Sequence, residues 1–187
     1  MHPPLKLVAV SGGMQRPSRT DALVERLVGA LSEALPIAPH FVHLGDVAPG
    51  LACSLDRRQL PADVLAHLAA IESADALVVA SPVYRASYSG LFKHFFDFVD
   101  QDALIDVPVL LAATGGSDRH ALVLDTALRP LFSFFQALTL PIGVYASPGD
   151  FDNYRVASAP LQARIQLAVT RALPHLKPRT RAPRAAE

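Results

Sequence analysis

The chain has 187 residues and a mass of 20.0 kDa, which is the size of one ordinary domain. Hydrophobic residues make up 51% of the sequence and charged residues 18%, so the chain can bury a large core and is not typical of disordered proteins. Its 17 basic residues balance its 17 acidic residues. This balance argues against a nucleic-acid partner, because nucleic-acid-binding domains carry a basic excess.

Cysteine content and hydropathy indicate the compartment of the protein. The single cysteine, Cys53, excludes an internal disulfide and a thiolate metal cluster. The first residues show no secretory signal, and no apolar run approaches the roughly 18 residues that span a bilayer. We therefore expect a soluble, cytoplasmic protein with no membrane partner.

Short apolar runs alternate with stretches of helical periodicity along the chain. The expected strands span residues 5–10, 38–44, 76–80, 107–113 and 140–146. The expected helices span residues 19–35, 64–71, 89–100, 118–138 and 159–173, and residues 45–61 are expected to be irregular. Because parallel strands require crossover connections, this alternation predicts an α/β fold: a doubly wound five-stranded parallel sheet with helices on both faces.

The sequence shows no internal repeat and no second domain, so residues 1–173 are predicted to form a single domain. Residues 174–187 are rich in proline and carry four basic residues against the acidic Glu187. We expect this segment to be a flexible tail.

Three loops at strand ends carry the functional signal. In an open parallel sheet, ligands bind at the carboxyl ends of the strands. The loops at 11–20, 81–89 and 114–120 each follow an expected strand, so all three open on the same edge. The sequence therefore predicts a ligand site at this edge.

The first loop reads Ser-Gly-Gly-Met-Gln-Arg-Pro-Ser-Arg-Thr and leads into a helix. Its backbone N–H groups, the hydroxyls of Ser18 and Thr20, the guanidinium groups of Arg16 and Arg19, and the helix dipole suit one phosphate. The loop is neither G-x-G-x-x-G nor G-K-[S/T], which disfavours a dinucleotide-binding Rossmann site and a P-loop. On this loop alone, an ordinary helix N-cap explains the residues equally well.

The other two loops suit a flat ligand. The second is stiffened by Pro82 and offers Tyr84 as a planar surface, although loop tyrosines often only pack. The third, Thr-Gly-Gly-Ser, presents backbone groups without side-chain bulk, as the edge of a heterocycle would require; a plain strand-to-helix turn is the alternative.

No catalytic or metal-binding set accompanies these loops. His40 and His43 make a poor metal pair without a third ligand, and Asp97 and Asp100 fit a solvated helix edge. The sequence contains no G-x-S-x-G motif. We therefore predict binding residues only, with no catalytic side chain and no metal.

The ordered set of motifs resembles one family. The motifs are Val-Ser-Gly-Gly…Arg-Pro-Ser-Arg-Thr at 10–20, Ala-Ser-Pro-Val-Tyr-Arg at 80–85, Tyr-Ser-Gly-Leu-Phe-Lys at 88–93, Ala-Ala-Thr-Gly-Gly-Ser at 112–117, His-Ala-Leu-Val-Leu-Asp at 120–125 and Leu-Arg-Pro at 128–130. Together they resemble the NAD(P)H-dependent FMN reductases with a flavodoxin-like fold. The resemblance is greatest to the reductase component of two-component alkanesulfonate and methanesulfonate monooxygenases, and it extends to about residue 173.

This resemblance implies strand order 2-1-3-4-5, with the FMN phosphate in the first loop and the isoalloxazine against the second and third. The residues it assigns to cofactor binding are Ser11, Arg16, Ser18, Arg19, Thr20, Pro82, Val83, Tyr84, Arg85, Ser87, Thr114, Gly115 and Gly116. Many relatives have a serine and an arginine early in the first loop, where this chain has Gly13 and Gln15. Which of the later residues of this loop contact the phosphate stays open.

The implied activity is the reduction of FMN by NADPH or NADH, with reduced FMN passed to a flavin-dependent sulfonate monooxygenase. The cofactor carries this chemistry, which agrees with the lack of a catalytic set. Two alternatives share the fold: a quinone, azo or metal-ion reductase with fixed FMN, and a flavodoxin-like electron carrier. The carrier is disfavoured, because carriers are strongly acidic and this chain is neutral.

Two further expectations concern assembly and flavin exchange. Apolar residues surround the expected 118–138 helix on more than one side, which predicts a homo-oligomer, a dimer or tetramer, through this helix. Pro130 should kink or bulge it. The three loops offer only Tyr84 and Tyr88 for stacking, so FMN is expected to be an exchangeable substrate.

Overall fold

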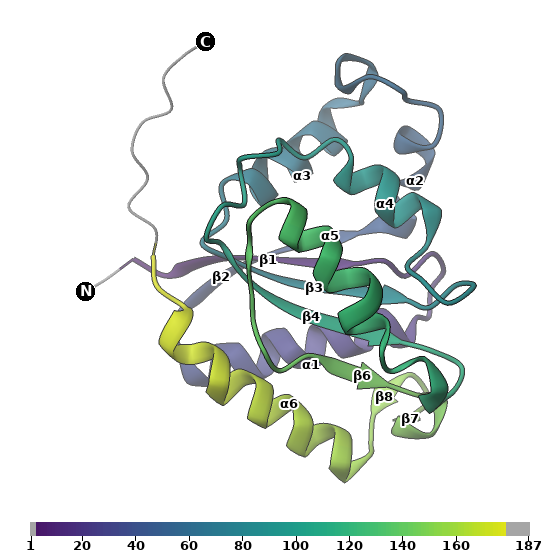
Figure 1. The fold of residues 1–187 in the computed structure, drawn as a ribbon, viewed down its shortest axis with the longest axis vertical. Helices are drawn as coiled ribbons and strands as arrows, with labels where there is room; N and C mark the ends of the chain where they lie inside the picture. The colour runs from purple at the N-terminus through teal and green to yellow at the C-terminus, as the bar shows by residue number, and fades with distance from the viewer. Residues whose placement is uncertain (1–2, 179–187) are drawn as a thin grey trace.

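The structure is a computed structural model that describes residues 3–178, and its centre is a parallel sheet (Figure 1). The four long strands are β1 (Leu5–Ser11), β2 (Ile37–His43), β3 (Ala76–Pro82) and β4 (Pro108–Thr114), and two short strands, β5 (Leu138–Thr139) and β6 (Val144–Ala146), share the last position. The order is β2-β1-β3-β4-β5, with β6 also paired to β4 and every pair parallel. The predicted doubly wound sheet of order 2-1-3-4-5, a flavodoxin-like order, is confirmed.

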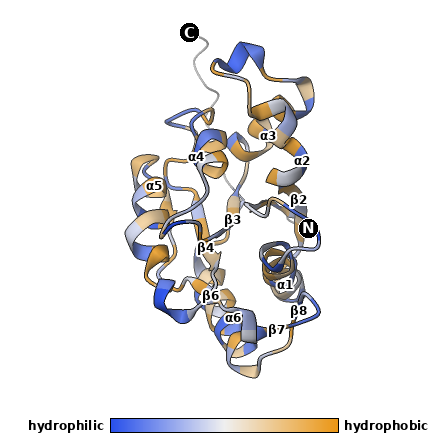
Figure 2. Ribbon diagram, turned by 90° about the vertical axis from the view of Figure 1, so that its right-hand side faces the viewer, coloured by the Kyte–Doolittle hydropathy of each residue, from blue (hydrophilic) through white to orange (hydrophobic). Residues whose placement is uncertain are grey.

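Helices cover both faces of the sheet (Figure 1). Helices α1 (Arg19–Ala34) and α6 (Ala159–Ala172) pack on one face, and α2 (Leu44–Leu51), α3 (Ala62–Glu72), α4 (Gly90–Phe96) and α5 (Arg129–Phe134) pack on the other. Alternate residues of β1 serve the two cores: Leu7 packs with α1 and α6, and Val8 packs with the other layer. Figure 2 shows the hydrophobic colour along the strands that these two cores bury.

Residues 45–61 were expected to be irregular, and this prediction is wrong. They contain most of α2 and a 3₁₀ turn at Arg57–Gln59. Leu44, Val47 and Leu51 recur at helical spacing and are buried, and this burial stabilises the short helix despite Pro49 inside it. The glycine and proline content had obscured this apolar face.

The single helix predicted for 118–138 is also wrong in extent. The segment has a 3₁₀ turn at Asp118–His120, a π-helical turn at Leu124–Leu128 and then the short α5. The expected bulge is confirmed: the π turn ends two residues before Pro130, whose missing N–H cannot bond to the carbonyl of Thr126.

Two more elements differ in extent. The helix predicted for 89–100 is the shorter α4, which ends at Phe96. Of the strand predicted for 140–146, only β6 (Val144–Ala146) forms, and β5 (Leu138–Thr139) lies before the predicted start. Pro141 lies between the two short strands and has no N–H to donate to β4, which interrupts the ladder.

Packed structure continues beyond residue 173, where the sequence analysis placed the start of the C-terminal tail. A 3₁₀ turn continues α6 over Leu173–His175, and Leu176 is buried against the α1–α6 layer. The part of the predicted tail at 179–187 lies outside the described residues. Within residues 3–178, no helix is both long and apolar enough to cross a membrane.

Candidate functional site

The three predicted loops meet at the carboxyl edge of the sheet and line a cleft of about 360 Å³, a volume typical of small-molecule sites. Nine of the predicted binding residues line it: Ser18, Arg19, Thr20, Pro82, Val83, Tyr84, Thr114, Gly115 and Gly116. The loops are tied together at its floor. The N–H of Val83 donates to the carbonyl of Thr114 at 2.7 Å, and the hydroxyls of Thr20 and Thr114 form a buried hydrogen bond of 2.7 Å.

The start of α1 forms one end of the cleft. Ser18 is the N-cap, and its hydroxyl accepts from the N–H of Asp21 at 3.2 Å. Among the described residues, the backbone N–H groups of Ser18, Arg19 and Thr20 donate to no acceptor, and the guanidinium of Arg19 forms no ion pair. Unused donors and positive charge at the N-terminus of a 16-residue helix suit an anion such as phosphate.

Two predicted residues of the first loop do not line this cleft. Arg16 donates from Nη2 to Asp46 Oδ2 at 2.7 Å, on the far side of the loop. The fully buried hydroxyl of Ser11 donates to Asp21 Oδ1, whose carboxylate lies under the loop beside His43. These contacts stabilise the loop on the side away from the cleft. Of the two arginines in this loop, Arg19 is the one that lines the cleft.

The second loop forms a tight turn. Tyr84 and Ser87 exchange backbone hydrogen bonds of 2.8 and 3.1 Å, and the two central residues, Arg85 and Ala86, have φ values of 48° and 70°. This conformation belongs to a two-residue turn of type I′. Tyr84 lies at the cleft with 52% of its surface exposed, whereas Arg85 and Ser87 do not line it.

The third loop is stabilised by Tyr145, a residue that the sequence analysis did not identify. The hydroxyl of Tyr145 on β6 donates to the carbonyl of Ser117 at 2.6 Å. A Cβ at Gly115 would lie 2.1 Å from this hydroxyl, so a larger residue there would displace the Tyr145 side chain, whereas a Cβ at Gly116 would meet nothing within 4 Å. Burial, with a further contribution from Asp118, raises the pKa of Tyr145 above its usual value, which keeps the hydroxyl protonated as a donor.

Two more residues of the cleft come from a fourth loop. Pro148 and Tyr154 follow β6 and line the cleft together with Tyr84. The sequence carried a usable signal, because any loop after the last parallel strand opens on the same edge. The expectation about aromatic residues is corrected in the same way: Tyr154 lines the cleft, and Tyr88 lies in a separate groove.

The residues present fit FMN. The unused donors beside Arg19 suit its phosphate, and the glycine turn with Pro82, Val83 and Tyr84 provides open, flat walls for a planar ring. Metal ligands do not gather in the described part of the chain, where no three His, Cys, Asp or Glu side chains come together. His40 pairs with His67, at 2.9 Å between ring nitrogens.

A parallel sheet of order 2-1-3-4-5, with a cleft between the start of α1 and the end of β4, defines an α/β protein of flavodoxin-like fold. The chain belongs to the NADPH-dependent FMN reductase family, which it matches over residues 5–152. It is therefore an oxidoreductase of the NAD(P)H-dependent FMN reductase class.

Similar proteins agree with this assignment. The chain is 62% identical over 182 residues to the NADH-dependent FMN reductase SfnF of Pseudomonas fluorescens, covering 95% of this chain and 97% of the relative. It is 63% identical over 174 residues to an FMN reductase (NADPH) of Pseudomonas aeruginosa, covering 93% and 94%. The apo crystal structure of an NADH:FMN oxidoreductase, EmoB, superposes with a TM-score of 0.81 at 29% identity, covering 91% of this chain and 89% of that one.

Proposed function

We propose that this protein reduces FMN with NADH or NADPH and passes the reduced FMN to a flavin-dependent sulfonate monooxygenase. The motif resemblance to sulfonate-system reductases and the SfnF-type relatives support this proposal. The lone cysteine supports a reducing, cytoplasmic location.

One observation carries the proposal. The cleft joins an anion site, with Arg19 and unused N–H groups, to a flat wall formed by Val83, Tyr84 and the Gly115–Gly116 turn. This combination matches the phosphate and the ring system of a flavin mononucleotide and leaves Tyr84 half exposed on the open side.

The chain's own part is to bind and to orient. FMN, when bound, supplies the hydride acceptor, and hydride transfer from a nicotinamide needs no protein acid or base. Arg19 and the start of α1 hold the phosphate. The backbone at Val83 and Thr114, joined by a hydrogen bond of 2.7 Å, would hold the ring of bound FMN.

The direct test is steady-state oxidation of NADH and of NADPH, with and without added FMN. We expect the purified protein to be pale and its rate to rise with FMN until it saturates, because FMN is an exchangeable substrate. A protein that purifies yellow, keeps FMN through dialysis and gains nothing from added FMN would instead be a reductase with fixed flavin. A protein that oxidises neither nucleotide would contradict the reductase function.

We further propose a homo-oligomer, a dimer or tetramer, built on the 118–138 segment. Six of its large apolar residues are buried within the chain, namely Val123, Leu124, Leu128, Leu131, Phe132 and Phe135. Phe134 and Leu122, however, are 66% and 69% exposed, and Leu138 is 42% exposed. Such side chains are commonly covered by a second subunit.

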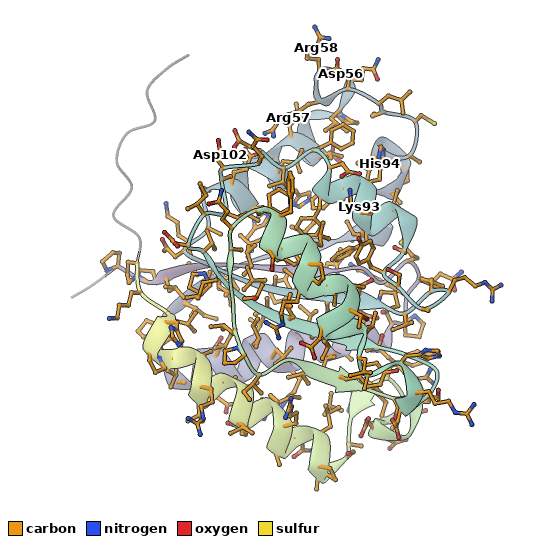
Figure 3. The ribbon with its side chains drawn as sticks, viewed as in Figure 1. Asp56, Arg57, Arg58, Lys93, His94 and Asp102 are labelled. Carbon is orange, nitrogen blue, oxygen red and sulfur yellow. The ribbon has the colours of Figure 1, made fainter. Side chains whose placement is uncertain are left out.

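A groove of about 950 Å³ lies beside these residues, between α4 and α5. Phe96, Phe134 and Phe135 contribute its aromatic part, and Lys93 and Asp102, labelled in Figure 3, contribute to its charged edge. We propose that the same surface of a second copy covers it. Light scattering at micromolar concentration should give a mass of at least twice 20.0 kDa, and a monomer would contradict this part of the proposal.

A further inference from the structure

We propose that Tyr154 is a positioning residue that holds Arg19 toward the flavin phosphate and thereby makes the site favour FMN over riboflavin. This inference rests on the proposed FMN reductase function and assigns a selectivity determinant within that site. It concerns a residue that lies outside the three motif-bearing loops.

Tyr154 lies at the tip of a small hairpin after the sheet. Strands β7 (Phe151–Asp152) and β8 (Arg155–Val156) pair antiparallel, and Asn153 and Tyr154 form the two-residue turn with φ values of 44° and 61°. The base of the hairpin is fixed, because Phe151 and Val156 pack against the α1–α6 layer and the N–H of Ala157 donates to the carbonyl of Asp150 at 2.9 Å. The position of the tip is therefore set by the core.

The ring of Tyr154 lies against the guanidinium of Arg19. Arg19 Cζ is 5.5 Å from the ring centroid, which is within the range of a cation–π contact, and both residues line the cleft. Arg19 is the first residue of α1, next to the unused N–H groups at the helix start. The hairpin thus restrains the arginine that adjoins the anion site.

The chemical nature of this partner matters. A carboxylate would neutralise the guanidinium and occupy its N–H groups, as Asp46 does for Arg16 at 2.7 Å. An aromatic face restrains a cation but accepts no conventional hydrogen bond from it. Within residues 3–178, Arg19 has no ion pair, so its donors stay available for a phosphate.

Tyr84 provides a matched control. It lines the same cleft and is similarly exposed, at 52% against 43% for Tyr154. Tyr84 adjoins the surface for the ring system, which FMN and riboflavin share, whereas Tyr154 adjoins Arg19 and the phosphate, which riboflavin lacks. The two tyrosines are therefore expected to differ in their effect on the two flavins.

The test measures KM and kcat for FMN and for riboflavin, with the same nicotinamide nucleotide, in Tyr154→Ala, Tyr154→Phe and Tyr84→Ala. Loss of an exposed cation–π contact should raise the FMN KM of Tyr154→Ala by roughly two- to fivefold. The preference for FMN over riboflavin should fall by the same factor, and kcat should change little. Tyr154→Phe should restore the preference, and Tyr84→Ala should raise both KM values together.

Combining Tyr154→Ala with Arg19→Ala completes a double-mutant cycle. Once Arg19 is absent, removing the Tyr154 ring should produce no further change in the FMN preference. Equal increases for the two flavins in Tyr154→Ala, or an unchanged FMN KM in a variant whose circular dichroism matches the wild type, would overturn the inference. Failure of the wild-type protein to reduce either flavin would instead overturn the proposed function.

Discussion

The side-chain hydroxyls of Thr20 and Thr114 lie 2.7 Å apart in a buried hydrogen bond that joins the first turn of α1 to the end of β4. Each hydroxyl has one proton, and their mutual bond uses only one of the two. One proton therefore stays available at the cleft. This pair links the loop that suits a phosphate to the loop that suits a ring.

Replacing both Ser18 and Thr20 with alanine should weaken FMN binding by about 2–4 kcal/mol, counting about 1.5–3 kcal/mol for each hydrogen bond to a charged group with partial additivity. Titration calorimetry or fluorescence quenching with FMN measures the change. Ser18 also caps α1, so the measurement belongs well below the melting temperature. Ser32→Ala on the same helix is the control: the hydroxyl of Ser32 donates to the carbonyl of Val28, away from the residues that line the cleft, so FMN binding should be unchanged.

Replacing each of the two arginines of the first loop should have different effects on FMN binding. Arg19→Ala should raise the FMN dissociation constant roughly tenfold to a hundredfold, because Arg19 faces the cleft and would lose a charged hydrogen bond. Arg16→Ala should have a smaller effect, because Arg16 is engaged with Asp46. A larger effect at Arg16 than at Arg19 would show that the loop rearranges to bind the phosphate.

Gly115→Ala should destabilise the protein, whereas Gly116→Ala should not. The new methyl group at 115 would lie 2.1 Å from the hydroxyl of Tyr145, which must then leave the carbonyl of Ser117. We expect a loss of about 1–3 kcal/mol in the free energy of unfolding, measured by denaturant titration. Equal stability of the two variants would contradict the close packing behind the third loop.

The His40–His67 pair should make the free energy of unfolding depend on pH. Burial, and secondly the charge of His40, lowers the pKa of His67 below its ordinary value of 6.5. The unfolded chain therefore takes up a proton at a higher pH than the folded protein does, and the free energy of unfolding should fall as the pH drops below 6.5. His67→Gln should remove part of this decline, while the exposed His120→Gln should leave it unchanged in chemical denaturation at several pH values.

Phe134→Lys should shift the protein toward a smaller species without unfolding it. The side chain is 66% exposed in the single chain, so its replacement removes little intrachain packing but introduces a charge into the proposed subunit contact. Size-exclusion chromatography with light scattering gives the mass, and a melting curve of the isolated species checks its fold. An unchanged mass would mean that the subunits meet elsewhere.

Local sequence patterns predict much of the fold. The runs at 76–80 in β3 and 108–113 in β4 are continuously apolar because both faces of a central parallel strand are covered, and their pattern differs from the helical periodicity of α1 and α6. Strands β1, β3 and β4 end in turns of small or stiff residues, and parallel pairing brings these turns to one edge. These patterns therefore predicted the parallel sheet and the edge at which the cleft lies, and the family resemblance supplied the strand order and the nine predicted residues that line the cleft.

The remaining features depend on contacts between distant segments. Burial decides that the glycine- and proline-containing Leu44–Leu51 is a helix, and pairing with β4 decides where the last strand breaks. Arg16 and Arg19 cannot be told apart by their sequence context. Only the folded structure shows that Arg16 binds Asp46 and that Arg19 packs against the ring of Tyr154. Periodicity indicates which face of a helix or strand is buried. It does not indicate which distant side chain will pack on that face or pair with a given charged residue.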